Sequence, residues 1–330
     1  MSQPEPFLDF VASAEAILTP WSASMGIDVP IVNAPMGGVA GGALAGAVSR
    51  AGGLGMIGIG SAGSAATLRS ELRHLSNMER PFGIGMIGWV VQREPELLRT
   101  ALEARPSLLS VSFGDDWSWV QHAHEAGCVT ATQIADLEEA QRAVDAGVQV
   151  LVARGAEGGG HGKPSIGTLA LLSEIIDRVA VPVLAAGGIA TGRALAGVLA
   201  VGASAAWLGT AFAACPEATL ADAARRVLIA AQATDTVTTR AFDVALGYPW
   251  PPTTPERVLR NAFTDSWVGR EGQLATDDEA VRALHTAIAD NDYRVAPINA
   301  GQGVAELVAI EPAATVIRRL CAEARGLLRG

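Results

Sequence analysis

Residues 148–163 read VQVLVARGAEGGGHGK, an apolar run that passes into a glycine-rich loop containing one histidine. The run Val148–Val152 predicts a buried strand, and the loop then lies at its carboxyl end. In parallel α/β proteins ligands bind at that edge of the sheet. Adjacent glycines permit positive φ and close approach of backbone to a ligand. A packing role for His161 in a plain turn is equally compatible with this stretch alone.

The same strand-then-helix pattern extends in both directions along the chain. Alanine-rich or amphipathic segments separate the apolar runs, and Gly52, Gly127, Gly147 and Gly202 follow such segments as helix C-terminal glycines do. The predicted strands are 31–34, 54–58, 82–87, 108–112, 128–132, 148–152, 183–185 and 205–208. The predicted helices between them are 40–51, 65–77, 95–104, 117–126, 135–146, 166–179 and 191–201.

Eight such units predict an α/β fold, a (β/α)8 TIM barrel. A doubly wound open sheet is the alternative, because alternation alone does not show closure. Residues 33–38, NAPMGG, do not fit the G-x-G-x-x-G turn that a dinucleotide-binding sheet would carry after its first strand.

The pattern changes after about residue 213. Residues 218–231 predict a helix, taken as the eighth of the barrel, and 313–329 predict a closing amphipathic helix. Residues 234–300 read as irregular, and a loop of that length is usually functional or a small subdomain. We therefore expect a barrel formed by 1–232 and 300–330, with 233–299 as a smaller, mostly helical lid inserted after strand eight.

The composition of the chain indicates which classes of binding partner and which compartment to expect. The chain has 330 residues, is 49% hydrophobic and carries a net charge of −10 without a basic block, so nucleic acid is not expected to bind. No lysine or arginine precedes Arg50, and the apolar runs are too short for a membrane span. Three scattered cysteines predict neither a disulfide framework nor a zinc site. We expect a cytoplasmic protein without a metal; a homo-oligomer is compatible with the sequence.

Two glycine turns follow the last predicted strands. They are Ala185-Ala186-Gly187-Gly188-Ile189 and Leu208-Gly209-Thr210-Ala211. In (β/α)8 enzymes the loops after strands seven and eight often bind phosphate through backbone amides. Each alone is also an ordinary tight turn, but the two in succession favour a phosphate site.

Other residues face the same predicted mouth with less specific signals. Met36 can contact a ring system or pack in the core, and Gln133 can bond a cofactor or cap a helix. The segment 110–115 is assigned to the pocket wall, and Lys163, the one lysine of the chain, to the solvated surface. Glu157 is a candidate for orienting its loop through backbone amides. Tyr248, Trp250 and Trp267 fit a lid over the pocket or, more commonly, the small core of the insertion.

Five segments in order resemble the nitronate monooxygenase family and its FMN-dependent enoyl-reductase relatives. They are Ala34-Pro35-Met36-Gly37-Gly38, Ala51-Gly52-Gly53-Leu54-Gly55, Glu157 to His161, Ala185 to Ile189 and Gly209-Thr210-Ala211-Phe212. Ala300-Gly301-Gln302-Gly303 resembles a family segment as well. The likeness covers nearly the whole chain. Gly158 replaces the usual alanine, and Gly85 stands where many relatives carry asparagine on strand three.

The resemblance implies a TIM barrel with non-covalent FMN and His161 as the catalytic acid or base. It implies a phosphate site at the two turns and a flavin ring between the first strand and the glycine loop. The implied cofactor-binding residues are Pro35, Met36, Gly37, Gln133, Gly160, Ala186, Gly187, Gly188, Leu208, Gly209 and Thr210. The implied reaction is oxidation of an alkyl nitronate or nitroalkane by O2 to a carbonyl compound and nitrite.

Two other functions remain open at this point. An NAD(P)H-dependent FMN reductase, acting on enoyl thioesters or quinones, would use the same loops. A non-catalytic flavin-binding protein would also keep the barrel, because a fold does not guarantee chemistry.

Overall fold

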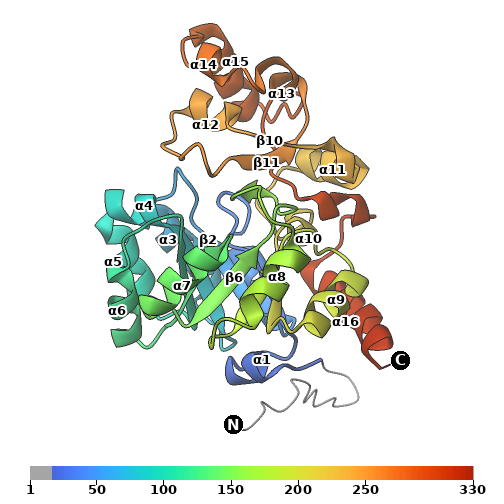
Figure 1. The fold of residues 1–330 in the computed structure, drawn as a ribbon. Helices are drawn as coiled ribbons and strands as arrows, with labels where there is room; N and C mark the ends of the chain where they lie inside the picture. Colours follow the sequence, from blue (N-terminus) through green and yellow to red (C-terminus); the bar gives the residue numbers. More distant parts are fainter. Residues whose placement is uncertain (1–16, 330) are drawn as a thin grey trace.

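The computed structural model describes residues 17–329, and its centre is a ring of eight parallel strands (Figure 1). The strands are β1 (Ile31–Asn33), β2 (Gly55–Gly58), β3 (Phe82–Ile87), β4 (Leu108–Ser112), β5 (Val129–Ile134), β6 (Val150–Arg154), β8 (Val183–Ala186) and β9 (Ala205–Leu208). They follow the order β1-β9-β8-β6-β5-β4-β3-β2, and a parallel bridge between Val32 and Leu54 connects the two ends. The predicted TIM barrel is confirmed, with all eight predicted strands in place.

A side-chain amide helps to close the barrel between β1 and β2, which a single backbone bridge connects. Asn33, at the end of β1, is fully buried. Its Nδ2 donates to the carbonyl oxygen of Met56 at 2.9 Å, and its Oδ1 accepts from the amide of Met56 at 2.8 Å. Asn33 therefore bonds β1 to β2 as another strand residue would, because an amide side chain carries both a donor and an acceptor.

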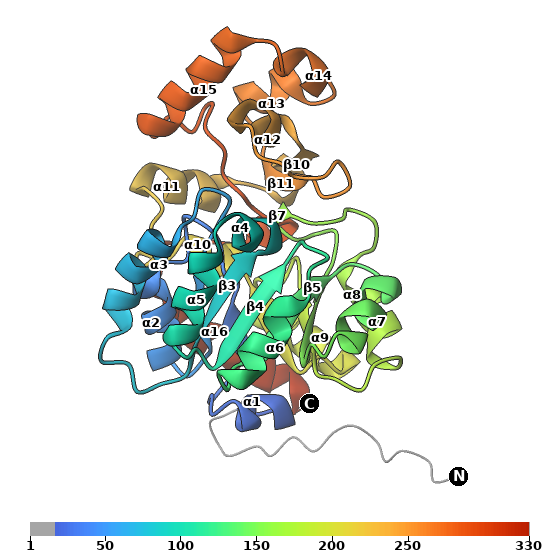
Figure 2. The same ribbon diagram turned by 90° about the vertical axis from the view of Figure 1, so that its left-hand side faces the viewer.

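The barrel interior is filled by apolar side chains from alternate strand positions, as the period of two requires. Trp207 on β9 and Leu54 belong to this inner cluster. Trp21 of α1 (Pro20–Ser24) belongs to it too, and α1 lies at the end of the barrel away from the upper lobe (Figures 1 and 2). The amino ends of the strands are thus closed, which leaves the carboxyl ends for a ligand.

Helices surround the ring. They are α2 (Gly42–Arg50), α3 (Ala65–Leu72), α4 (Gly88–Arg93), α5 (Pro95–Glu103), α6 (Ser118–Glu125), α7 (Leu137–Asp145), α8 (Thr168–Ile176), α9 (Gly192–Val201), α10 (Thr210–Ala213), α11 (Asp222–Ala230) and α16 (Ala313–Leu328), with 3-10 turns η1 (Arg73–Leu75), η2 (Ala233–Asp235) and η3 (Gln302–Glu306). The ends of α9 agree with the sequence: Thr191 caps its start, and Gly202 ends it at a φ of 113°.

The assignment of the eighth barrel helix was wrong. The helix predicted at 218–231 is α11, which packs beside η3 near the barrel mouth. The eighth position is occupied by α16, which packs against α9 and α2. The chain therefore leaves the barrel after β9, builds the upper lobe, and returns to complete the ring. The sequence shows both helices but not which of them packs on the strands.

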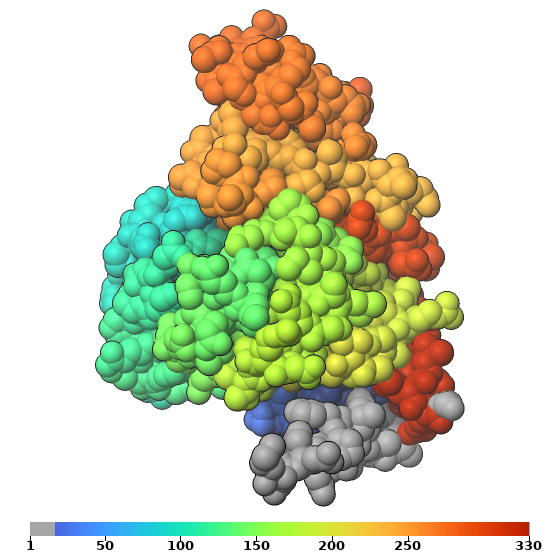
Figure 3. All heavy atoms as spheres, in the orientation of Figure 1, coloured from blue at the N-terminus to red at the C-terminus, as the bar shows by residue number. Residues whose placement is uncertain are grey.

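The segment 234–300 read as irregular in places, but it forms the smaller, mostly helical insertion expected after strand eight. This segment contains β10 (Thr236–Thr239), α12 (Ala241–Leu246), β11 (Glu256–Leu259), α13 (Ala262–Trp267), α14 (Glu271–Leu274) and α15 (Asp278–Ala289). Phe242, Phe263 and Leu284 are among the buried residues of its own core. The elements form a lobe above the carboxyl ends of the barrel strands (Figures 1 and 3).

A small antiparallel sheet joins this lobe to the barrel. The two-residue strand β7 (Gly160–His161) comes from the glycine loop after β6 and pairs with β11, which pairs with β10. In the register, His161 stands opposite Glu256, and Gly160 opposite Arg257. The predicted histidine is therefore part of a sheet shared with the lobe.

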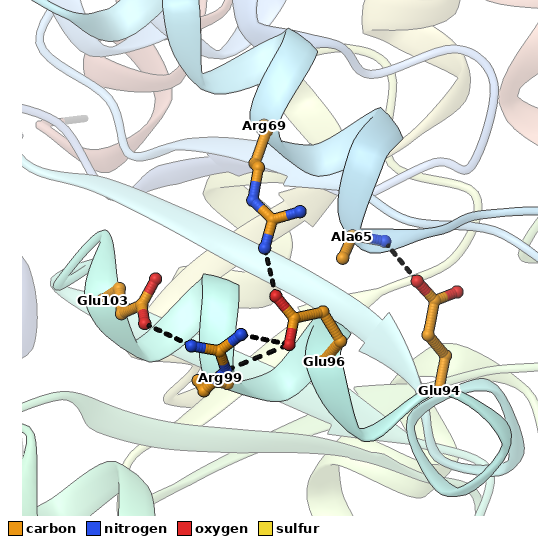
Figure 4. Close-up of polar contacts among 6 residues, drawn as sticks. All are labelled: Ala65, Arg69, Glu94, Glu96, Arg99 and Glu103. Atoms are coloured by element: carbon orange, nitrogen blue, oxygen red, sulfur yellow. Dashed lines mark hydrogen bonds and ion pairs between the residues drawn. The ribbon is translucent and has the colours of Figure 1, made fainter.

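The outer helices are connected by charged side chains, as between α3 and α5 (Figure 4). Glu96 pairs with both Arg69 and Arg99. Glu94 Oε1 accepts from the amide of Ala65 at 2.8 Å and so caps α3. Such exposed ion pairs contribute little to stability. Among residues 17–329, no helix is both long and apolar enough to cross a membrane.

Candidate active site

A cavity of about 250 Å³ lies at the carboxyl ends of the strands, beneath the lobe. Most residues predicted for the site line it: Pro35, Met36, Gly37, Gln133, Gly160, His161, Ala186, Gly187, Gly188, Gly209 and Thr210. Leu208 is the exception. It is 1% exposed in the core, where its carbonyl oxygen accepts from the amide of Ala34 at 2.8 Å. Five segments far apart in sequence thus meet at one mouth.

One end of the cavity is formed by the two glycine turns after β8 and β9. Gly187 and Gly188 have φ values of 116° and 69°, which side-chain-bearing residues rarely adopt. A Cβ on Gly187 would lie 2.7 Å from Thr168 Oγ1. Helix α10 begins at Thr210, so its first amides have no partner within the helix. The Thr210 hydroxyl accepts from the amide of Gly301 at 2.9 Å and keeps its own proton for donation.

Apolar side chains and one amide side chain also line the cavity. Pro35 and Met36 follow β1, and Gln133 lies on β5. Gln133 does not cap α7, because Asp136 accepts from the amide of Glu139 there. A Cβ on Gly85 would lie 2.2 Å from Pro35 Cγ. In this chain the position of the usual asparagine is therefore occupied by the proline ring of Pro35.

These features fit a flavin mononucleotide. The glycine turns offer backbone approach and a hydroxyl at one end, where a phosphate needs donors. Pro35 and Met36 offer apolar surface and Gln133 an amide side chain, which suit an aromatic ring system carrying polar edges.

A buried arginine that the sequence analysis missed holds the glycine loop in shape. Arg154, at the end of β6, is 6% exposed. Its Nη2 donates to the carbonyl oxygens of Gly158 at 2.7 Å and Gly160 at 2.9 Å. Burial, and then the charge of Arg257, lower the pKa of Arg154 to about 10, while Glu157 opposes this shift. Arg154 is therefore still charged at neutral pH. Its guanidinium also requires a glycine at position 162, because a Cβ there would lie 2.4 Å from Arg154 Cζ.

Glu157 binds backbone, as the sequence suggested, but on a helix after the loop. Its Oε2 accepts from the Thr168 amide at 2.8 Å and from the Thr168 hydroxyl at 2.8 Å. The carboxylate thus caps the N-terminus of α8, where negative charge is favourable. Its own carbonyl oxygen accepts from the amide of Gln302, which fixes the loop to η3.

His161 is held by groups from the lobe. Its Nε2 lies 3.0 Å from both Oδ1 and Oδ2 of Asp243, on α12. The side chains of His161 and Asp243 are 14% and 4% exposed. The imidazole also stacks on Trp250, with ring centroids 3.6 Å apart and planes 7° apart. A buried carboxylate that accepts one imidazole N–H fixes the tautomer and the ring orientation.

Trp250 lines the cavity and thus covers the pocket, where the more common role for such a residue is in the core of the insertion. Its Nε1 donates to Ser61 Oγ at 3.0 Å, and Phe113 packs edge-on against its ring at 5.0 Å. Trp267, by contrast, packs in the core of the lobe, as expected. Tyr248 is half-buried and is not part of the cavity wall.

Asp243 and Glu256 were not predicted, and the sequence carries no clear signal for them. Both lie in the segment that read as irregular; the β7–β11 register places Glu256 opposite His161, and the packing of α12 brings Asp243 to it. The donor nitrogen of His161 and carboxyl oxygens of these two residues lie within 4.8 Å of one another. The expectation that no metal takes part stays a prediction.

The remaining ionisable residues have other roles. Lys163 was assigned to the solvated surface, but it is one-third exposed and paired with Asp136 at 2.8 Å and Glu139 at 2.7 Å. It connects the segment after His161 to α7. His74, His122, His124 and His285 are exposed. Ser110, Ser112 and Phe113 lie in the cavity wall, also as predicted.

A TIM barrel with a phosphate-type cradle and a carboxylate-held histidine at its mouth fits a flavin-binding oxidoreductase. Comparison with known proteins makes this specific. The family model for nitronate monooxygenase matches residues 19–94 and 90–323. A nitronate monooxygenase of Pseudomonas aeruginosa is 34% identical, over 92% of this chain and 98% of its own length.

Two solved structures are similar throughout. The structure of FabK from Thermotoga maritima superposes with a TM-score of 0.82 at 28% identity, covering 95% of this chain and 98% of its own. The nitroalkane oxidase from Streptomyces ansochromogenes superposes with a TM-score of 0.78 at 29% identity, covering 92% and 98%. The chain belongs to the nitronate monooxygenase family, and it is a flavin-dependent oxidoreductase.

Replacing Arg154 by methionine tests its role in the glycine loop. Methionine fills a similar volume but leaves the carbonyls of Gly158 and Gly160 without their donor. We expect the free energy of unfolding to fall by about 2 kcal/mol, the scale of hydrogen bonds to a charged group. Amide hydrogen exchange at residues 158–162 should accelerate. The control is Arg142→Met on exposed α7, and equal behaviour of the two variants in chemical denaturation would contradict this role.

Proposed function

We propose that the protein is an FMN-dependent nitronate monooxygenase that oxidises alkyl nitronates with O2 to a carbonyl compound and nitrite. The observation that carries this proposal is the placement of His161, held by Asp243 and Trp250 at the wall of a cavity that the two glycine turns also line. Family membership and the likeness to a nitroalkane oxidase structure support the reaction class.

FMN would be held at two ends. Ala186, Gly187, Gly188, Gly209 and Thr210 would bind the phosphate, and Leu208 would support the turn from the core. Pro35, Met36, Gly37, Gln133 and Gly160 would surround the ring. When bound, FMN supplies the two-electron redox chemistry, which no amino-acid side chain offers. In this proposal the barrel comprises residues 1–232 and 300–330, and the lid is 233–299.

The protein's own contribution to the reaction is a proton site. If Nε2 of His161 donates to Asp243, its Nδ1 has the free lone pair and serves as the base. His161 would then remove the proton beside the nitro group of a neutral nitroalkane. Once protonated, the same imidazolium would hold the nitronate oxygens by charge and hydrogen bond. Stacking on Trp250 limits rotation of the ring, so the base stays in one orientation.

Removing the imidazole should abolish turnover while keeping the cofactor. We expect His161→Ala to bind FMN as the parent does and to lose at least about a hundredfold in kcat/KM with nitroethane, the usual scale for a positioned acid or base. Oxygen uptake measures the rate, and absorbance measures the flavin. His285→Ala, at an exposed position on α15, is the matched control. Undiminished turnover in His161→Ala would remove this residue from the mechanism.

A reductase is the second candidate, because the family is related to FMN-dependent enoyl reductases and the FabK structure is similar over nearly the whole chain. The nitronate substrate itself reduces the flavin, so a nitronate monooxygenase needs no NADH or NADPH as reductant. We expect anaerobic mixing with NADH or NADPH to leave the flavin absorbance unchanged, and mixing with a nitronate to bleach it. Fast bleaching by NADH or NADPH would favour the reductase.

A further inference from the structure

Glu256 is placed beside the histidine and its carboxylate. It begins β11 directly opposite His161 on β7, and cross-strand partners present their side chains on the same face of the sheet. Glu256 is 5% exposed and Asp243 is 3% exposed. Two carboxyl groups and one imidazole therefore share a small buried volume, with their polar atoms within 4.8 Å of one another.

The cluster contains no ammonium or guanidinium partner among the described residues. Asp243 pairs only with His161, and Glu256 forms no ion pair. Arg257, the next residue on β11, turns away and donates to the carbonyl oxygen of Ala156 at 2.9 Å. Three other charged side chains come from neighbouring segments: Arg154 is bound to loop carbonyls, Arg240 before α12 has an Nε without a hydrogen-bond partner, and Glu271 on α14 accepts from the Thr239 hydroxyl. Helix α15, which packs against α12, carries Asp278, Glu279, Arg282 and His285, and none of them pairs with Asp243 or Glu256 among residues 17–329.

This arrangement requires a proton. Two ionised carboxylates at such separation in a buried site repel each other, and one of them keeps its proton instead. Burial, and then the charge of Asp243, raise the pKa of Glu256 well above its usual range. Asp243 is the group that accepts from His161, so the neutral carboxyl is Glu256. A neutral carboxyl has an O–H to donate, and a carboxylate oxygen of Asp243 lies within 4.8 Å of it.

We propose that Glu256 is a positioning residue of the reaction: it keeps its carboxyl proton beside Asp243, holds that carboxylate against His161, and reduces the negative charge that the imidazole faces. The inference rests on the proposed catalytic role of His161. It adds a third member to the pair, one that touches neither substrate nor flavin. It also gives a reason for a glutamate at a buried strand position, where an apolar residue would otherwise be favoured.

The sign of the effect follows from the charge. Without the Glu256 O–H, the full charge of Asp243 acts on His161 and favours the imidazolium. The free base then exists only at higher pH. The acidic limb of kcat/KM for a neutral nitroalkane should therefore move upward, by about one pH unit, the lower end of effects from an adjacent charge. Glutamine offers an N–H in the same place and should preserve the wild-type limb.

The test compares Glu256→Leu with Glu256→Gln in the flavin-loaded enzyme after dialysis against EDTA. The rate with nitroethane is followed against pH, and the His161 imidazole is titrated by NMR, with its signal identified by its loss in His161→Ala. We expect both the rate limb and the imidazole titration to move upward in Glu256→Leu and to stay in place in Glu256→Gln. Unmoved titrations in a folded, flavin-bound Glu256→Leu would overturn the inference.

Infrared spectroscopy tests the proton without relying on the leucine variant. The parent at neutral pH should show the C=O stretch of a protonated carboxyl that Glu256→Gln removes. If that band is absent from the parent, Glu256 is ionised and the inference fails. Failure of the proposed function is seen separately: His161→Ala would then keep its turnover, whatever the infrared and NMR results on Glu256.

Discussion

The hydrogen bond between His161 and Asp243 connects the two halves of the molecule. His161 belongs to the loop after β6 of the barrel, and Asp243 belongs to the lobe that follows β9. Because both groups are nearly buried, water competes weakly for the bond, and the short strand pairing between β7 and β11 fixes the backbone of His161 to the lobe. The histidine can have its orientation only when the lobe is folded onto the barrel.

The barrel and the lobe contribute different parts of the proposed site. The barrel supplies the parts that suit a cofactor: the glycine turns after β8 and β9, the wall at Pro35, and the loop shaped by Arg154. The lobe supplies the acid–base environment through Asp243, Trp250 and Glu256. Changes in the lobe should therefore alter proton transfer while leaving the flavin bound. Fold and family thus leave the substrate to be decided by residues of the lobe.

The sequence predicted the barrel well because each strand and its helix are local signals, with apolar runs and terminal glycines at regular spacing. It predicted the cavity lining for the same reason, since the ends of parallel strands meet at one edge. It missed the contributions that depend on long-range pairing. Arg154 ends an otherwise apolar strand and bonds backbone, a role without a motif. Glu256 meets His161 through the lobe's sheet and Asp243 through the packing of α12, and α16 replaces α11 on the barrel by tertiary packing alone.

The central claim is that a flavin mononucleotide lies across the barrel mouth with His161 opposite it. Titration of the flavin-free protein with FMN and with riboflavin, followed by flavin fluorescence, tests this most directly. The account predicts one FMN per chain and binding of riboflavin about a hundredfold weaker, because the cradle at Gly187, Gly188 and Thr210 has no phosphate to hold. A protein that binds neither compound, or binds both equally, would contradict it.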